Sequence, residues 1–268
     1  MLNRRIFGVM ILALLSLYGM IHAQEPPDKL VQVVYNGIEF SYAPEAFGAV
    51  LPVYDEGTPY QTDAPYFANI APHTSFKFMR PDPAYPDINW VGELRVYRIA
   101  DLEAYAEPTY REVVDQLRTL DTATLAAHVN AGPDARLPGL PFMPVLNATQ
   151  VFWAHPKVLI SGTAAGVEYC TYYSVAPEPI VEGQVMYAYQ AISVDGLYYL
   201  SFSMPLETGL LDSAIPDQLN VDEFVADYVS YLQKTFDAIN TADPATFKPL
   251  PDELTRFIKS ISIVEKPD

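Results

Sequence analysis

The chain has 268 residues, a formal net charge of −17 and a single cysteine, Cys170. A chain of this length can bury one substantial core or two small ones, and with one cysteine it forms no intramolecular disulfide. The net negative charge repels phosphate backbones and anionic lipid headgroups, so neither nucleic acid nor a membrane surface is an expected partner.

The first 23 residues have the layout of a cleaved secretory signal. Arg4 and Arg5 precede an apolar run from Ile6 to Ile21, and Ala23 is a small residue at the expected cleavage point. The run is short for a membrane span and a polar segment follows it, which favours cleavage over a retained anchor. No cysteine follows it to carry a lipid. Cleavage removes two arginines and no acid, so the charge becomes −19, and we expect a secreted or extracytoplasmic protein without a stable membrane span.

The mature chain begins with a strand and a stretch rich in proline. Residues 37–42 alternate apolar and polar side chains, which predicts a strand that ends before Pro44. Residues 44–86 hold eight prolines, a density that leaves room for one short strand, at 75–79. The rest of 44–86 is predicted to form an ordered Pro-rich loop layer, because it carries more aromatic residues than a disordered linker does.

The middle of the chain predicts strand, helix and strand again. A strand is expected over 90–99, and apolar residues at helical spacing predict a helix over 108–129, with Pro108 in its first turn. Residues 132–144 are rich in turn formers and end it. Residues 151–153 and 158–160 then predict one interrupted strand or two short ones.

A meander follows, with alternating runs at 167–175, 185–194 and 197–204. Asp195-Gly196 between the last two runs predicts a hairpin with a type I′ turn, which pairs residue 194 with 197 and residue 187 with 204.

This register sorts the hairpin side chains onto two faces. The face with Tyr187, Tyr189 and Phe202 is apolar for almost its whole length, whereas the other face turns polar and carries one ring, Tyr199. The pattern predicts an antiparallel sheet packed on one side, with most of these rings in the core.

The C-terminal part predicts a helix over 221–240, a short helix over 252–259 and a last strand over 260–264. The fold class is therefore α+β. Residues 24–268 are expected to form one domain, an antiparallel sheet of six to eight strands whose apolar face is covered by helices 108–129 and 221–240.

Three segments resemble an uncharacterised family of exported bacterial proteins and lipoproteins. Residues 140–152 carry a Pro-Phe-x-Pro…Asn-Ala-x-Gln-Val-Phe run, residues 166–169 a Gly-Val-x-Tyr strand, and residues 195–199 an Asp-Gly-x-Tyr-Tyr hairpin. The family has no assigned activity, so the resemblance implies export and no catalytic residues. This chain lacks the lipidation cysteine of the lipoprotein members, so tethering is not implied.

The two ends of the mature chain are similar to the PsbP-type photosystem lumenal proteins. Residues 37–44 resemble their first Gly-x-x-Phe-x-Tyr-x-Pro strand, and residues 259–263 their last Lys-Ser-Ile-x-Ile strand. That resemblance implies an α/β/α sandwich around an antiparallel sheet and an accessory or adaptor role, although a fold does not fix a function.

No pattern in the sequence predicts a catalytic residue, a metal site or a cofactor. His73, His128 and His155 lie far apart and each is expected to be a surface or satisfied histidine. Cys170, in a predicted strand, is expected to be a half-buried, inert thiol. The abundant carboxylates, Asp55-Glu56 among them, are expected to be solvated.

The leading hypothesis is an exported, non-enzymatic binding or accessory protein for an unknown protein or small ligand. Its candidate anchors are Tyr54, Tyr60, Tyr66 and Tyr85, unless these rings only pack the loop layer onto the sheet. One alternative is a secreted hydrolase, which requires a cleft with two facing acids of raised pKa. Another is a soluble carrier, which requires a closed apolar pocket between sheet and helix.

Overall fold

The computed structural model describes residues 29–80, 90–121, 123, 125 and 139–264. The predicted signal segment 1–23 lies outside this part of the chain, as do Tyr85, His128 and Val129. The elements described below belong to the unit of the chain that begins at Val31.

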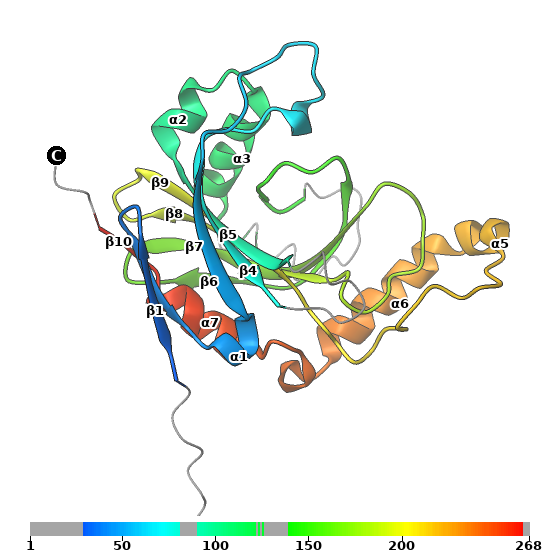
Figure 1. Cartoon of the computed structure of the whole chain (residues 1–268). Helices are drawn as coiled ribbons and strands as arrows, with labels where there is room; N and C mark the ends of the chain where they lie inside the picture. The colour runs from blue at the N-terminus through cyan, green and yellow to red at the C-terminus, as the bar shows by residue number, and fades with distance from the viewer. Residues whose placement is uncertain (1–28, 81–89, 122, 124, 126–138, 265–268) are drawn as a thin grey trace, which may run out of the picture. The chain divides into compact units, whose positions relative to one another are not determined.

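Seven antiparallel strands form the main sheet (Figure 1). In spatial order they are β3 (Ala49–Asp55), β4 (His73–Met79), β5 (Trp90–Arg98), β9 (Tyr198–Pro205), β8 (Met186–Ser193), β7 (Ala164–Ser174) and β6 (Thr149–Ile160). The strands predicted from alternation are confirmed as β4 to β9. The interrupted strand is confirmed too, because the pairing of β6 shifts between Ala154 and Lys157. The α+β class with an antiparallel sheet is confirmed.

A second sheet has three strands, β1 (Val31–Tyr35), β2 (Ile38–Tyr42) and β10 (Ser262–Ile263), with β2 in the centre. Asn36 and Gly37 join β1 to β2 with φ values of 50° and 76°. Positive φ at both residues is the geometry of a two-residue type I′ hairpin. Strand β10, at the end of the described residues, therefore pairs with a strand close to their beginning.

One face of the main sheet, which we call the phenylalanine face, packs against β2, α1 (Pro44–Phe47), α6 (Tyr228–Thr241) and α7 (Pro251–Ser260). Its buried rings include Phe40, Phe47, Phe76, Phe78, Phe202 and Phe257. The ring centroids of Phe202 and Phe257 are 4.9 Å apart. These contacts fix α7 against the centre of the sheet through apolar burial.

The opposite face, which we call the tyrosine face, packs against α2 (Ile99–Ala104), α3 (Pro108–Thr119) and the loop 139–146. Its buried rings include Tyr97, Tyr110, Tyr169 and Tyr199. In Figure 1, α2 and α3 lie on the other side of the sheet from α1 and α7. Of the two long helices, α3 packs on the tyrosine face and α6 on the phenylalanine face, so the prediction that both cover one face was wrong.

The expectation of a sheet packed on one side was wrong because the polar residues of the second face are buried. Gln190 is one of them, and its side-chain oxygen accepts hydrogen bonds from the Met143 N–H at 3.0 Å and the Tyr199 hydroxyl at 2.8 Å. Its amide nitrogen donates to Ser201 Oγ at 3.0 Å. Buried polar groups are stable when hydrogen-bonded, so polarity here marks a tie to the loop rather than exposure.

The Pro-rich layer is more regular than predicted. Besides the short helix α1 and a 3₁₀ turn at Tyr66–Ala68, it contains all of β3. Pro52 lies inside β3, which pairs with β4 at the end of the main sheet. An edge strand tolerates proline because the missing N–H can fall on the unpaired side.

Both long helices are shorter than expected. Residues 221–240 divide at Asp227 into α5 (Val221–Ala226) and α6, and only α6 has buried residues. Val221 and Val225, expected in the core, are exposed on α5, which extends away from the sheet in Figure 1. The helix predicted over 108–129 is interrupted: α3 ends at Thr119, and residues 123 and 125 are helical again. The two C-terminal elements are confirmed as α7 and β10.

The hairpin between β8 and β9 has the predicted register, because Tyr187 pairs with Met204. Its turn is not of type I′. Gly196 has a φ of 77°, but Asp195 is not among the described residues with positive φ, and the Gly196 N–H donates to the Ser193 carbonyl at 2.8 Å. The pairing of the strands thus followed from alternation, whereas the turn type did not follow from the Asp-Gly dipeptide.

Candidate ligand-binding cleft

A cleft of about 540 Å³ lies where the small sheet meets the main sheet. One wall is the β1–β2 turn with Ile263 and Val264, and the other is formed by β3, β4, the end of β5 and the start of β9. Tyr54, His73, Arg98, Asp101 and Tyr198 are its ionisable residues. Four strands of the main sheet and the first turn of α2 thus bring together residues that are far apart in the sequence.

His73 is the most buried of these residues, with 3% of its surface exposed. Its Nδ1 lies 2.9 Å from the Ala71 carbonyl oxygen, and its ring stacks on Tyr97 with centroids 5.0 Å apart. Because a carbonyl can only accept, Nδ1 carries the proton and Nε2 keeps a lone pair. Within the described residues, Nε2 has no hydrogen-bond partner.

The electrostatic surroundings keep the His73 ring neutral. Burial lowers the pKa of His73 below its ordinary value, and the Arg95 guanidinium lowers it further; the Ala71 carbonyl, Asp55 and Glu93 act in the opposite direction. A neutral imidazole with Nδ1 protonated can accept one hydrogen bond at Nε2. Because His73 lies beside Tyr97, its ring is on the tyrosine face, opposite to the side chains of Thr74 and Arg98.

Arg98 and Asp101 bring opposite charges to the same cleft. Arg98 is the last residue of β5, and Asp101 lies in the first turn of α2. The two side chains make no ion pair with each other, and neither has a partner elsewhere in the described part of the chain. Both charges are therefore available to a molecule in the cleft.

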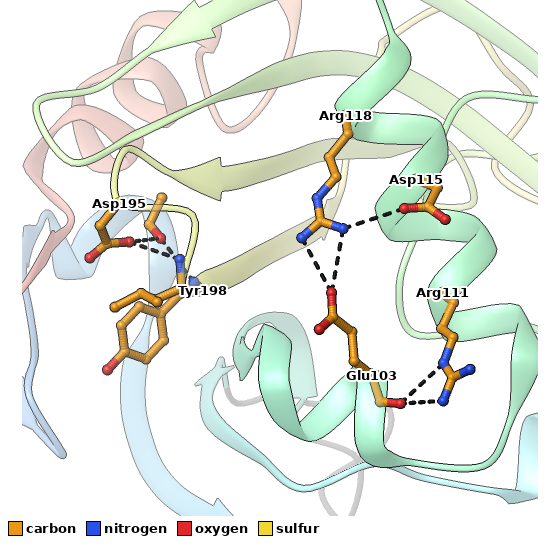
Figure 2. Close-up of polar contacts among 8 residues, drawn as sticks. Glu103, Arg111, Asp115, Arg118, Asp195 and Tyr198 are labelled. Carbon is orange, nitrogen blue, oxygen red and sulfur yellow. Dashed lines mark hydrogen bonds and ion pairs between the residues drawn. The ribbon is translucent and has the colours of Figure 1, made fainter.

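Two tyrosines flank these polar groups. Tyr54, on β3, is 50% exposed, and Tyr198 is the half-buried first residue of β9. Figure 2 shows how the preceding turn holds Tyr198: its backbone N–H donates to Ser193 Oγ at 2.9 Å, and Ser193 Oγ donates to Asp195 Oδ1. The Ser193 hydroxyl and the Leu197 N–H, which also donates to Asp195, lower the pKa of the Asp195 carboxyl.

Asn36 closes the cleft from the side of the small sheet. Its side-chain nitrogen donates to Thr74 Oγ1 at 2.8 Å and so ties the β1–β2 turn to β4. The Thr74 hydroxyl hydrogen then remains available as a donor. The sequence prediction missed both β1 and this residue, although Asn36-Gly37 between two apolar runs is a strong hairpin signal.

The predicted tyrosine anchors do not form one surface. Tyr54 lines the cleft, whereas Tyr60 packs edge-on against Tyr105 with centroids 6.0 Å apart. The Tyr66 hydroxyl donates to the Leu146 carbonyl at 3.1 Å, which ties the loop layer to the loop 139–146. Tyr85 lies outside the described residues.

The other residues considered for chemistry have structural partners. Cys170 is buried in the core of the phenylalanine face rather than half-buried, and burial raises the pKa of its thiol to about 12. His155 Nε2 lies 2.8 Å from the Ile239 carbonyl oxygen. Asp55 Oδ1 accepts from the Gly57 N–H at 2.8 Å.

Two buried carboxylates lie on opposite faces of the main sheet and do not form a pair. Glu93 contacts Arg95 Nε at 2.7 Å, and Glu168 contacts Lys157 Nζ at 2.7 Å. Glu93 is next in β5 to Leu94 of the phenylalanine-face core, so it points to the tyrosine face, whereas Glu168 accepts from Tyr187 in the phenylalanine-face core. The cleft itself has one carboxylate among its lining residues, Asp101.

Within the ranges that the structure describes, no three histidine, cysteine or acidic side chains are grouped so as to hold a metal ion. In the same ranges, every helix is too short or too polar to cross a membrane.

No family model matches the chain, and comparisons with curated proteins and with solved structures gave no match either. The resemblances noted in the sequence therefore stay predictions, and the function has to be argued from the cleft.

Proposed function

We propose that this protein is an exported, non-enzymatic binding protein that holds a small polar ligand in the cleft between its two sheets. One observation carries the proposal: Arg98 and Asp101 line the cleft together, and neither side chain has an ion-pair partner among the described residues. Small-molecule sites are concave and orient their ligands with a few convergent polar groups. A volume of about 540 Å³ is within the usual range of such sites.

Binding is favoured over hydrolysis by the composition of the cleft. A glycosidase-type mechanism requires two carboxyl groups on either side of the scissile bond, and the cleft lining contains Asp101 alone. The lining also differs from the closed apolar pocket expected of a carrier for apolar ligands, because it is open and carries charged and polar groups.

The proposal is tested by thermal unfolding of the secreted protein in the presence of small polar metabolites of different charge class. We expect at least one class to raise the melting temperature, because a ligand that binds only the folded state stabilises it. The increase should be lost in Arg98→Gln and kept in Arg111→Gln, a matched change on the outer side of α3. If no class stabilises the protein, or if Arg98→Gln responds like the wild type, the cleft is not a binding site.

Export is tested separately by N-terminal sequencing of the protein from the extracytoplasmic fraction. We expect the mature chain to begin at Gln24, directly after the small residue Ala23. A chain that keeps residues 1–23 and sediments with membranes would show that the apolar run is an anchor.

A further inference from the structure

We propose that the ligand is a small zwitterion of the amino-acid type, with a carboxylate bound by Arg98 and a protonated amine bound by Asp101. The inference rests on the proposed function, because it names the ligand class of the same cleft. It follows from the charges, the hydrogen-bonding capacity and the aromatic walls of the cleft.

The charges favour a ligand that carries both signs. Arg98 and Asp101 line one cleft without neutralising each other. An anion without a positive group would pair with Arg98 but be repelled by Asp101. A cation without a negative group would pair with Asp101 but be repelled by Arg98. The net charge of −17 adds a long-range repulsion against anions. A zwitterion meets both groups and adds no net charge to the cleft.

An uncharged polar group of the cleft fits the same ligand. The buried Thr74 hydroxyl already accepts from Asn36, so it has a hydrogen to give to a carboxylate oxygen. The cleft therefore presents acceptors for an amine and donors for a carboxylate.

The aromatic walls suit the remaining parts of such a molecule. Tyr54 and Tyr198 line the cleft from β3 and β9. The face of a tyrosine ring attracts a nearby ammonium group and also packs against an apolar side chain. The volume of about 540 Å³ leaves room for a side chain or a second residue beside the two charged groups.

The test is calorimetric titration of the secreted protein with three matched probes: L-phenylalanine, 3-phenylpropionate, which lacks the amine, and 2-phenylethylamine, which lacks the carboxylate. An analogous trio built on L-leucine controls for the choice of side chain. We expect the amino acid of at least one trio to bind, and both of its analogues to bind at least about tenfold more weakly.

Two variants assign the two ends of the ligand. Arg98→Gln should weaken the amino acid about tenfold or more and abolish residual binding of the carboxylate analogue. Asp101→Asn should weaken the amino acid but not the carboxylate analogue, which should bind equally well or more tightly because Asp101 no longer repels it. Asp115→Asn, on the outer side of α3, is the matched control and should change nothing.

The outcomes separate the ligand class from the proposed function. If an analogue binds as tightly as its amino acid and loses affinity in Arg98→Gln, the zwitterion inference is wrong while the binding cleft stands. If none of the six probes binds at millimolar concentration, the inference is overturned. The proposed function then fails as well if the wider metabolite panel gives no stabilisation dependent on Arg98.

Discussion

The two faces of the main sheet are built from different rings, and they hold different kinds of chain. Among the largest fully buried side chains, every phenylalanine belongs to the phenylalanine face, whereas three of the four tyrosines belong to the tyrosine face: Tyr97, Tyr169 and Tyr199, but not Tyr189. The phenylalanine face holds α7 and the small sheet, in which backbone N–H and C=O groups bond to each other along the helix and between the strands. The tyrosine face also holds the irregular loop 139–146, whose backbone groups need partners.

The hydroxyl group accounts for this difference. Tyr169 donates to the Pro141 carbonyl at 2.6 Å, and Tyr199 donates to Gln190, which accepts from the Met143 N–H. A phenylalanine in either place would bury a similar area and leave these groups unsatisfied. Apolar burial is non-directional and suits regular elements, whereas directional hydrogen bonds select one conformation of a loop.

The largest effect is expected at the centre of the phenylalanine face. Phe202 has none of its surface exposed and packs against Phe257 with ring centroids 4.9 Å apart. Phe202→Ala removes a buried ring and leaves a cavity between the sheet and α7, so the free energy of unfolding should fall by about 3–5 kcal/mol. Urea denaturation measures this change.

The control for this prediction is Phe67→Ala in the Pro-rich layer. Phe67 is 38% exposed, so its replacement should cost less than about 1 kcal/mol. Equal losses for the two variants would contradict the view that this face is stabilised by the packing of its rings.

A smaller effect is expected on the tyrosine face, where one hydroxyl is removed and the ring is kept. Tyr169→Phe leaves the buried Pro141 carbonyl without its donor, which should lower the free energy of unfolding by about 1–3 kcal/mol. Tyr54→Phe is the matched control and should cost almost nothing, because that ring is half exposed. A loss no larger than that of Tyr54→Phe would mean that the loop is held by ring burial alone.

These two faces also show what the sequence could predict. Strict alternation placed β5 and β7 to β9 and set the pairing of Tyr187 with Met204, because the side-chain period of a strand is fixed. It failed on the second face of the sheet. Gln190 and Ser201 have the polarity of exposed residues, and only their contacts with Met143 show that they are buried.

The cleft was beyond sequence reasoning for a similar reason. Arg98 and Asp101 stand out by no pattern in the sequence, and they line one cleft because α2 follows β5 directly. Asn36 and Val264 lie more than two hundred residues apart and meet because β10 pairs with β2. Of the three predicted tyrosines that the structure describes, Tyr54 is the one that it places in the cleft.

A pH dependence is expected at the edge of the tyrosine face, where His73 stacks on Tyr97. Burial lowers the pKa of His73, so the unfolded chain takes up the proton first as the pH falls below about 6.5. Because the unfolded state then binds more protons, the free energy of unfolding should decrease with falling pH in that range.

The variant His73→Asn isolates this contribution, since its amide can still donate to Ala71. Unfolding free energies at several pH values below 6.5, each referred to pH 8, should fall less steeply in His73→Asn than in the wild type. Identical slopes would show that the protonation of His73 does not destabilise the folded state.

The smallest effect is expected from the charges on the outer side of α3. Figure 2 shows Arg118 between Glu103 and Asp115, with nitrogen–oxygen distances of 3.4 Å to each. All three side chains are well exposed, so Arg118→Gln should cost no more than about 0.5 kcal/mol in urea denaturation, and less at high salt. Leu117→Ala, on the buried side of the same helix, should cost about 2–4 kcal/mol. If the two variants were equally destabilised, surface charge rather than contact with the tyrosine face would hold α3 on the sheet.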